Sequence, residues 1–268
     1  MNRLLKIFLI LGIFACSHAN AQEAAPKDSA KLSDGYIYVH TARNAPIFLK
    51  DGKEFNASAG ELIKAGGISV KCDSSQVVTL VFSNRLVLYA RGPAEFSIEE
   101  FSQEQPFEMD FSDIKEPTTS LLNISVKSGI YYLSSPTPRA TSRMVLKTPF
   151  GNFEPRSEQF KLSCLPEMAE LDVFQGQSIF KALDGKADFI QQKEAGLVEK
   201  SHSKEMYPLK INTLTLLQEE NEEDNFSLCK MALSSIFFDF DKSGKKIKVE
   251  RLTPKDFLIK RTKYDYRW

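Results

Sequence analysis

Residues 77–98 decide the fold and read VVTLVFSNRLVLYARGPAEFSI. Three apolar runs lie in this stretch, rich in the β-branched and aromatic side chains that suit a half-buried pleated surface. Turn-forming residues separate them, which predicts short strands joined by tight turns. The runs are 77–82, 86–89 and 96–98, and the turn formers are Ser83-Asn84-Arg85 and Arg91-Gly92-Pro93.

The same pattern of short apolar runs and turn-forming residues continues on both sides of this stretch. Strand-like runs begin at Tyr36, and helical periodicity is nearly absent up to about residue 200. We therefore expect an all-β domain over residues 34–200, a short-strand stack of solenoid or sandwich type. The further predicted strands are 68–72, 123–133, 144–148, 160–164, 170–174, 178–181 and 187–190.

The C-terminal segment, residues 201–268, is small and mixed. The acidic block 219–224 predicts a solvated loop. The apolar stretch 226–240 fits either a helix or two strands, and 245–252 alternates like a strand. Thr253-Pro254 reads as a helix start, because Thr caps a helix and Pro suits its first position.

The chain of 268 residues carries 35 basic and 35 acidic side chains, so its formal net charge is zero. This balance excludes a global attraction to nucleic acid or anionic membrane. The charges are nevertheless grouped. The acidic stretch 99–118 predicts a solvated connection, since it lacks the spacing and the Gly of a calcium loop. The basic, aromatic tail 242–268 either pairs with the acidic blocks or binds an anionic envelope polymer.

Residues 1–21 have the order of a secretory signal. Two basic residues precede the apolar stretch 7–15, and Ala19-Asn20-Ala21 supplies small residues for cleavage after Ala21. The apolar stretch is too short to span a bilayer, and no later segment is long enough. A lipid anchor at Cys16 is the alternative. Residues 22–33 read as a flexible leader, so we expect an exported protein, periplasmic or extracellular.

The mature chain offers few groups for catalysis or metal binding. Its histidines are His40 and His202, and its cysteines are Cys72, Cys164 and Cys229. An odd number of cysteines leaves at least one unpaired, and their apolar neighbours favour buried thiols, with one disulfide left open. Since CxxC, HExxH and paired histidines are missing, we expect neither a metal site nor a cofactor.

Several short pieces, in order, resemble the FecR domain over about residues 58–198. The family-motif residues are Lys147, Thr148, Pro149, Gly151, Arg156, Gly176, Gly185 and Gly196. Pro149 suits an edge or turn, and Gly176 and Gly185 suit tight reversals between short strands. The chain differs from the family after this arginine: where the family has Gly-Thr, this sequence has Ser157-Glu158. Turn and register specification is the expected role of these residues, with a binding role for an exposed Arg156 as the alternative.

The resemblance implies a cell-envelope protein. Its best-known members are signalling proteins with a cytoplasmic anti-sigma segment, a membrane helix and this domain outside. The present chain is expected to be an exported, stand-alone version, acting as a non-enzymatic binding or scaffold module for an envelope protein or polysaccharide. Two alternatives remain: a signalling regulator working through a separate membrane partner, and an envelope-polymer hydrolase using paired carboxylates or His40 or His202.

Overall fold

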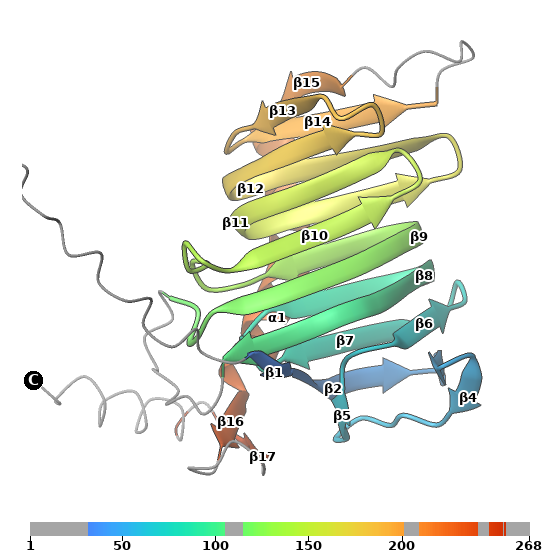
Figure 1. Ribbon diagram of the computed structural model, residues 1–268, viewed down its shortest axis with the longest axis vertical. Helices are drawn as coiled ribbons and strands as arrows, with labels where there is room; N and C mark the ends of the chain where they lie inside the picture. The colour runs from blue at the N-terminus through green and yellow to red at the C-terminus, as the bar shows by residue number, and fades with distance from the viewer. Residues whose placement is uncertain (1–31, 105–114, 201–208, 241–246, 254, 256–268) are drawn as a thin grey trace, which may run out of the picture. The chain divides into compact units, whose positions relative to one another are not determined.

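The computed structural model describes residues 32–104, 115–200, 209–240, 247–253 and 255. A 15-stranded sheet system, a separate two-stranded sheet and one long helix are the main elements of these residues, which confirms the all-β prediction (Figure 1). None of the described helices is both long and apolar enough to cross a membrane. The elements are β1 (Leu32–Asp34), β2 (Tyr36–Arg43), β3 (Ile47–Lys50), β4 (Lys53–Phe55), β5 (Leu62–Lys64), β6 (Ile68–Cys72), β7 (Val77–Phe82), β8 (Val87–Glu104), β9 (Ser120–Ser134), β10 (Arg143–Thr148), β11 (Gly151–Leu165), β12 (Met168–Ala182), β13 (Ala187–Ile190), β14 (Glu194–Glu199), β15 (Leu209–Thr213), α1 (Leu216–Ser234), β16 (Ile236–Phe240) and β17 (Ile247–Arg251).

Three strands, β8, β11 and β12, are much longer than predicted, and β9 extends the predicted strand 123–133 by four residues. β8 has 18 residues, and β9, β11 and β12 have 15 each. The predicted strands 86–89 and 96–98 both lie largely in β8, and 170–174 and 178–181 both lie in β12. The prediction of separate short strands is therefore wrong for β8 and β12, because residues such as Gly92-Pro93 bend a strand without ending it.

Each long strand contributes to two layers. Before its bend, β8 pairs with β7 and with the second half of β9; after the bend, it pairs with β6 and the first half of β9. β11 and β12 divide in the same way at a register shift between Ser157 and Gln159. The first layer contains β2, β7, β14 and β15 with one half of each long strand, and the second contains β3, β6, β10 and β13 with the other halves.

Two glycines make the bends sterically feasible. Gly129 has φ +122° and Gly176 has φ +101°, a region that L side chains rarely adopt. A Cβ on Gly129 would lie 2.6 Å from the Ala94 Cβ, and one on Gly176 would lie 2.6 Å from the Ser157 Cα. Gly176 thus serves a bend inside β12 and not the predicted tight reversal, whereas Gly185 lies in the β12–β13 turn.

The core lies between the two layers and is rich in phenylalanine. Side chains from both halves of the long strands enter it, so burial of one apolar interior holds the layers together. The free thiols of Cys72 and Cys164 are buried in it, as the apolar neighbours of these cysteines predict. Its largest fully buried aromatic rings include Phe48, Phe82, Phe96, Phe153, Phe160 and Phe180.

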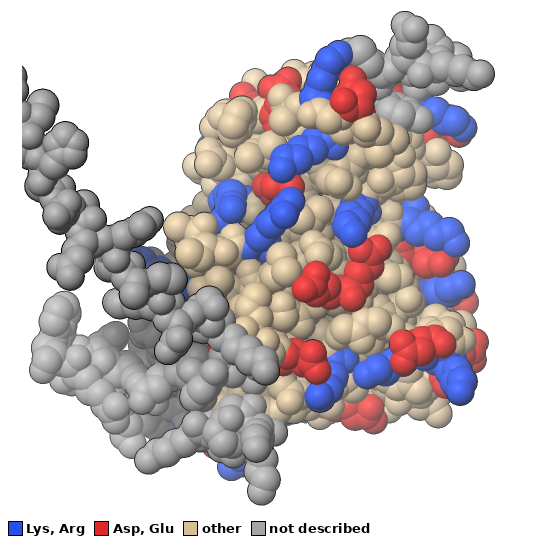
Figure 2. Space-filling model, in the orientation of Figure 1, with Lys and Arg blue, Asp and Glu red and all other residues tan. Residues whose placement is uncertain are grey.

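Ion pairs between strands lie on the outer surface of the second layer. The Lys147 Nζ lies 2.6 Å from a Glu99 carboxylate oxygen, and both the Arg143 guanidinium and the Lys181 ammonium lie within 3 Å of Glu154. Basic and acidic side chains are interspersed over the face shown in Figure 2. Glu99 thus belongs to a strand and pairs with lysine there, although the sequence predicted a solvated connection from residue 99 onward.

Candidate functional site: the groove beside helix α1

Helix α1 occupies the acidic block that was predicted to be a loop, so that prediction is wrong. Thr215 caps its N-terminus: the Gln218 N–H donates to the Thr215 Oγ1 at 3.3 Å, and the Thr215 N–H donates to the Gln218 Oε1 at 2.8 Å. Glu219 lies in the first turn, where the helix dipole favours an acid. This capping box was present in the sequence and would have indicated the helix.

α1 packs on the outer surface of the first layer. Its buried residues are Phe226, Cys229 and Ala232, which recur every three residues and so share one face. The Phe226 ring lies 5.7 Å from the Tyr132 ring on β9 and 4.9 Å from the Phe174 ring on β12. The helix is therefore anchored by aromatic packing across two strands of the sheet.

A charged cluster lies beneath the same helix. The Lys161 Nζ on β11 lies 2.8 Å from Glu222 on α1 and 3.3 Å from Asp172 on β12. The Glu222 carboxylate also accepts hydrogen bonds from the Tyr132 hydroxyl at 2.7 Å and the Asn225 amide at 3.0 Å. All three ionic side chains are less than one-fifth exposed, so this cluster joins the helix to the sheet in a poorly solvated position.

Burial and ion pairing act on the pKa values of this cluster in different proportions. Burial raises the pKa of Asp172 above its usual range despite the opposing effect of Lys161. For Glu222, burial acts in the same direction, but hydrogen bonds from Lys161 and Tyr132 outweigh it and lower the pKa. The Asp172 Oδ1 is buried without a hydrogen-bond partner. Lys161 thus lies within ion-pair distance of both carboxylates of this cluster.

Two adjoining hollows run along one side of α1, and we call them together the α1 groove. Their volumes are about 460 and 450 Å³, within the range of small-molecule sites. They share Gln159, Gln175 and Lys230, so the hollows form one continuous groove between helix and sheet. The other residues that line it are Ser134, Ser135, Glu158, Phe174, Gln192, Leu216, Glu219, Glu220, Glu223, Phe226, Met231, Leu233 and Ser234.

The walls of the α1 groove differ in chemistry. Gln159, Gln175 and Gln192 come from the sheet and its loops and carry amides, which both donate and accept hydrogen bonds. The N-terminal half of the helix contributes carboxylates at 219, 220 and 223, and Lys230 is the single cation lining the described groove. The groove therefore favours neutral or cationic ligands over anionic ones.

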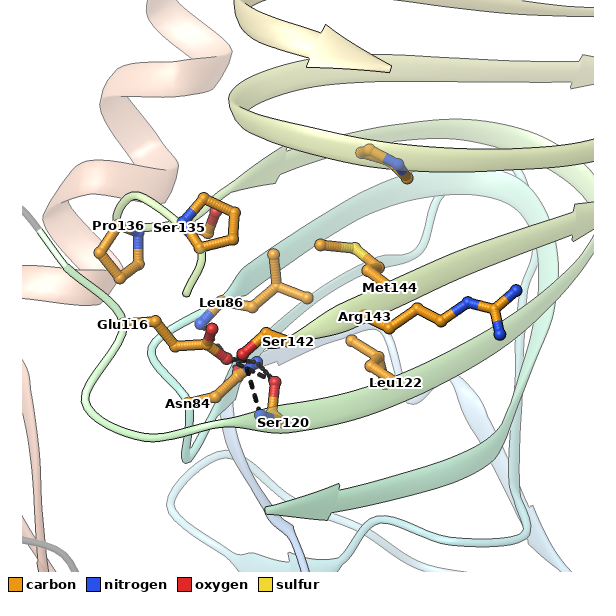
Figure 3. A pocket seen from close by; sticks show the side chains of 12 residues that line it. Asn84, Leu86, Glu116, Ser120, Leu122, Ser135, Pro136, Ser142, Arg143 and Met144 are labelled. Atoms are coloured by element: carbon orange, nitrogen blue, oxygen red, sulfur yellow. Dashed lines mark hydrogen bonds between the residues drawn. The ribbon is translucent and has the colours of Figure 1, made fainter. Parts of the chain in front are cut away.

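A second hollow surrounds Glu116, between the β9–β10 connection and the sheet. Figure 3 shows the side chains of Asn84, Ser120 and Ser142 converging near the Glu116 carboxylate. That carboxylate accepts hydrogen bonds from Asn84 at 3.1 Å, from the Ser120 hydroxyl, and from the Arg139 N–H at 3.1 Å. The hollow has a volume of about 20 Å³, which leaves room for roughly one water molecule. The hydrogen bonds around this hollow thus join the β8–β9 connection, which carries Glu116, to the β9–β10 connection, which carries Arg139.

The family-motif residues are spread over the second layer and the end of the sheet. Lys147 pairs with Glu99, and the Thr148 hydroxyl donates to the Gly151 carbonyl at 2.8 Å across the turn that contains Pro149. Gly185 lies in the β12–β13 turn, and Gly196 lies in β14. None of the eight motif residues lines the α1 groove.

Arg156 is exposed, as expected, but its guanidinium is engaged by the neighbouring loop. Its Nη1 donates to the carbonyl oxygens of Arg139, Ala140 and Ser142, at 3.4, 3.3 and 2.6 Å. Since Ser142 also lines the Glu116 hollow, Arg156 positions one wall of that hollow. The Ser157-Glu158 departure from the family pattern coincides with the strand irregularity between Ser157 and Gln159.

His40 does not have the surroundings of a catalytic triad. Its Nδ1 lies 3.1 Å from the Thr41 Oγ1, where a triad would need a carboxylate, and its Nε2 lies 3.2 Å from the Ser235 Oγ. Burial, and then the nearby Arg251, lower the pKa of His40 below its usual value, which favours the neutral ring. His202 lies outside the described residues.

The described part of the chain contains no cluster of His, Cys, Asp and Glu able to hold a metal ion. Cys72, Cys164 and Cys229 are all buried and free, so no disulfide joins them. Pro254 and most of the basic tail lie outside the described residues, so the predicted helix start at Thr253-Pro254 stays a prediction.

Comparison with known proteins found no matching family model and no matching curated protein. Two crystal structures of a "putative anti-sigma factor" from Parabacteroides distasonis show some similarity, each covering 69% of this chain and 99% of its own. Their sequence identities are 7% and 8%, and both TM-scores are 0.37. These values assign no function, and the resemblance to the FecR domain rests on the sequence pieces given above.

Proposed function

We propose that this chain is an exported, non-enzymatic binding or scaffold module of the bacterial cell envelope, and that it takes a glycan ligand in the α1 groove. The groove carries the proposal, because an amide wall, a carboxylate wall and the half-buried Phe174 ring line one elongated hollow. Glutamine amides can match the hydroxyl and acetamido groups of a sugar, which also donate and accept. An aromatic ring offers an apolar surface to the C–H face of the same ligand.

The charges of the groove narrow the class of ligand. Glu219, Glu220 and Glu223 line one half of it, so a polyphosphate or polyanionic chain would be repelled there. We therefore propose a neutral or amino-sugar-containing oligosaccharide. The carboxylate of Glu158 accepts hydrogen bonds from Thr137 and Gln175, which supports a structural and not a catalytic role for that acid.

The test measures binding of a defined sugar probe, tetra-N-acetylchitotetraose, by isothermal titration calorimetry. The double variant Gln159→Ala, Gln192→Ala removes two amides from the groove, and Gln177→Ala, an exposed glutamine outside the groove, is the control. Loss of two hydrogen bonds of about 1 kcal/mol each should weaken binding by about tenfold or more, while the control keeps wild-type affinity. Wild-type protein that retains neither this probe nor any glycan from an envelope extract would count against the proposal.

A second candidate is a regulator of envelope signalling that works through a separate membrane partner. The pieces that resemble the FecR domain support this alternative, including the segments from Lys147 to Gly151 and from Leu171 to Gly176. Co-purification of one membrane protein with wild-type chain, resistant to added sugar probe, would favour signalling over glycan binding.

A further inference from the structure

His40 on β2 lies where α1, β16 and β17 meet the first layer. Its Nε2 lies 3.2 Å from the hydroxyl oxygen of Ser235, the residue that follows α1 and precedes β16. The Ser235 carbonyl in turn accepts a hydrogen bond of 2.7 Å from the N–H of Leu252, the residue after β17. One half-buried histidine therefore contacts the junction that joins the helix to the β16–β17 hairpin.

The β16–β17 hairpin is docked on the first layer by its side chains. It forms a two-stranded sheet separate from the large one, so no strand pairing connects the two in the described chain. Ile236 and Phe238 of β16 belong to the same buried cluster as Tyr38 of β2. The docking of the hairpin therefore depends on apolar packing and on a few polar contacts at its base.

The hydrogen bonds around His40 match a neutral imidazole. The Ser235 hydroxyl donates to the Ala232 carbonyl at 2.9 Å, so it accepts from the imidazole, and the proton of the neutral ring is assigned to Nε2. Nδ1 then accepts from the Thr41 hydroxyl, 3.1 Å away. Within the described residues both ring nitrogens contact hydroxyl groups and not carboxylates. A protonated ring would thus lack a counter-ion at this position.

A second cation already lies at this junction. The Arg251 Nε on β17 donates to the Tyr38 hydroxyl, and the guanidinium carbon lies 5.6 Å from the centre of the Tyr38 ring. Because Tyr38 and His40 are two residues apart on β2, a charge on His40 would be added close to that of Arg251. Burial first, and Arg251 second, lower the pKa of His40, which agrees with these contacts.

The other charged residues on the surrounding elements do not compensate a cation on His40. All are exposed to solvent except Glu250, which pairs with Lys248 at 3.4 Å. That pair lies on the face of the hairpin opposite to Arg251, because strand side chains alternate. The charged residues on or beside β2, β5, β16, β17 and the second half of α1 are Arg43, Glu61, Lys64, Lys230, Asp239, Lys248 and Glu250, with Arg251.

We infer that His40 is an acid-sensitive latch for the β16–β17 hairpin: the neutral ring holds the junction at Ser235 on the sheet, and protonation loosens the hairpin. The docked state disfavours the charged ring, whereas an undocked hairpin leaves the ring in solvent, where histidine binds a proton near pH 6.5. The contribution of His40 to docking is therefore complete above that pH and is lost as the pH falls through the lowered pKa of the docked state. The inference does not depend on the ligand of the α1 groove.

The first test is amide hydrogen exchange of the full chain at pH 7.5 and pH 5, corrected for the intrinsic pH dependence of exchange. Protection of β16 and β17 should fall by at least about threefold at pH 5, and by no more than about thirtyfold, the limit for a ring that titrates at pH 6.5 when undocked and stays neutral when docked. His40→Gln keeps a donor toward Ser235 but does not titrate, so the loss should disappear.

The control for this test is His202→Gln, which removes a histidine elsewhere in the sequence and should keep the wild-type loss. The raised pKa values of Glu170 and Asp172 on β12 are common to all three proteins, so the difference between them isolates His40. Equal protection of the wild-type hairpin at both pH values, or a wild-type loss in His40→Gln, would overturn the inference.

The second test follows the His40 ring by proton NMR and needs no weakened protein. The ring signal is assigned by its absence in His40→Gln and is titrated in the wild type and in Arg251→Gln. We expect a wild-type pKa below the usual histidine value, and a higher pKa in Arg251→Gln because the second cation is gone. A wild-type pKa at or above the usual value, or one that Arg251→Gln leaves unchanged, contradicts the latch.

Discussion

Replacement of Lys161 by methionine should weaken the attachment of helix α1 to the sheet. Lys161 lies between Glu222 and Asp172, and the three side chains are 18%, 17% and 9% exposed. Methionine fills most of the same volume but leaves two carboxylates without their cation. Removal of one partner of a buried ion pair costs about 3–5 kcal/mol. Because these groups are not fully buried, we expect about 3 kcal/mol, a loss of roughly 6–12 °C in Tm.

The assay is urea unfolding followed by circular dichroism, with amide hydrogen exchange to locate the change. Lys200→Met is the control, since the Lys200–Glu167 pair has a similar length of 3.4 Å but side chains that are 53% and 68% exposed. This exposed pair should contribute less than about 1 kcal/mol. Exchange in Lys161→Met should rise mainly in α1, whereas in Lys200→Met the exchange of α1 should stay unchanged.

The pH dependence of the same variant provides an independent check. In the wild type, the lowered pKa of Glu222 contributes stability that is present above the usual glutamate pKa and is lost as the pH falls through the folded value. The raised pKa of Asp172 acts in the opposite sense, since its contribution is lost as the pH rises. In Lys161→Met both carboxylates lack their cation, so the deficit should shrink from pH 7 to pH 4. A deficit equal to that of Lys200→Met, or one independent of pH, would refute the reasoning.

Three further changes follow from the bends, the loop contacts and the thiols. Gly176→Ala should destabilise by about 2 kcal/mol or more, because φ is positive and a Cβ would lie 2.6 Å from the Ser157 Cα, whereas Gly66→Ala, with open space around it, should be nearly neutral in thermal unfolding. Arg156→Met should raise hydrogen exchange in the loop around residues 139–142 and leave exchange in α1 unchanged; equal exchange of that loop in the wild type and in Arg156→Met would contradict the contacts to its carbonyls. Burial raises the pKa of Cys164 to about 11 and of Cys229 to about 12, and with Asp73 raises that of Cys72 to about 11, so a thiol reagent at pH 8 should react slowly until the protein unfolds, and rapid reaction of the native protein would disagree.

The sequence predicted the all-β class because the alternation at 68–72 and the apolar run at 77–82 depend only on local side-chain direction. It did not predict the long bent strands. Gly92-Pro93 looks the same in a sequence whether the chain reverses or bends, and only pairing with β9 on both sides of it distinguishes the two.

The first half of helix α1 was not predicted for a different reason, whereas 226–234, where a helix was one of the two alternatives, is helical. The charges at 219–224 were read as solvent-exposed loop, although Thr215 and Gln218 carried the signature of a helix start. The α1 groove could not be predicted even with the helix assigned, since its walls join residues 159, 175 and 192 to a helix whose docking is a tertiary event. The motif residues, by contrast, lie at turns, bends and ion pairs of the sheet.

The bent strands also affect how this architecture can vary. In a sandwich of two separate sheets, an added strand lengthens one sheet and leaves the other short. Here one additional bent strand after β12 would extend both layers and the interior between them by the same step, because each long strand supplies a half to each layer. Lineages that gain or lose such a unit would change the length of the molecule while keeping its cross-section, and the surface that carries α1 would keep its local shape.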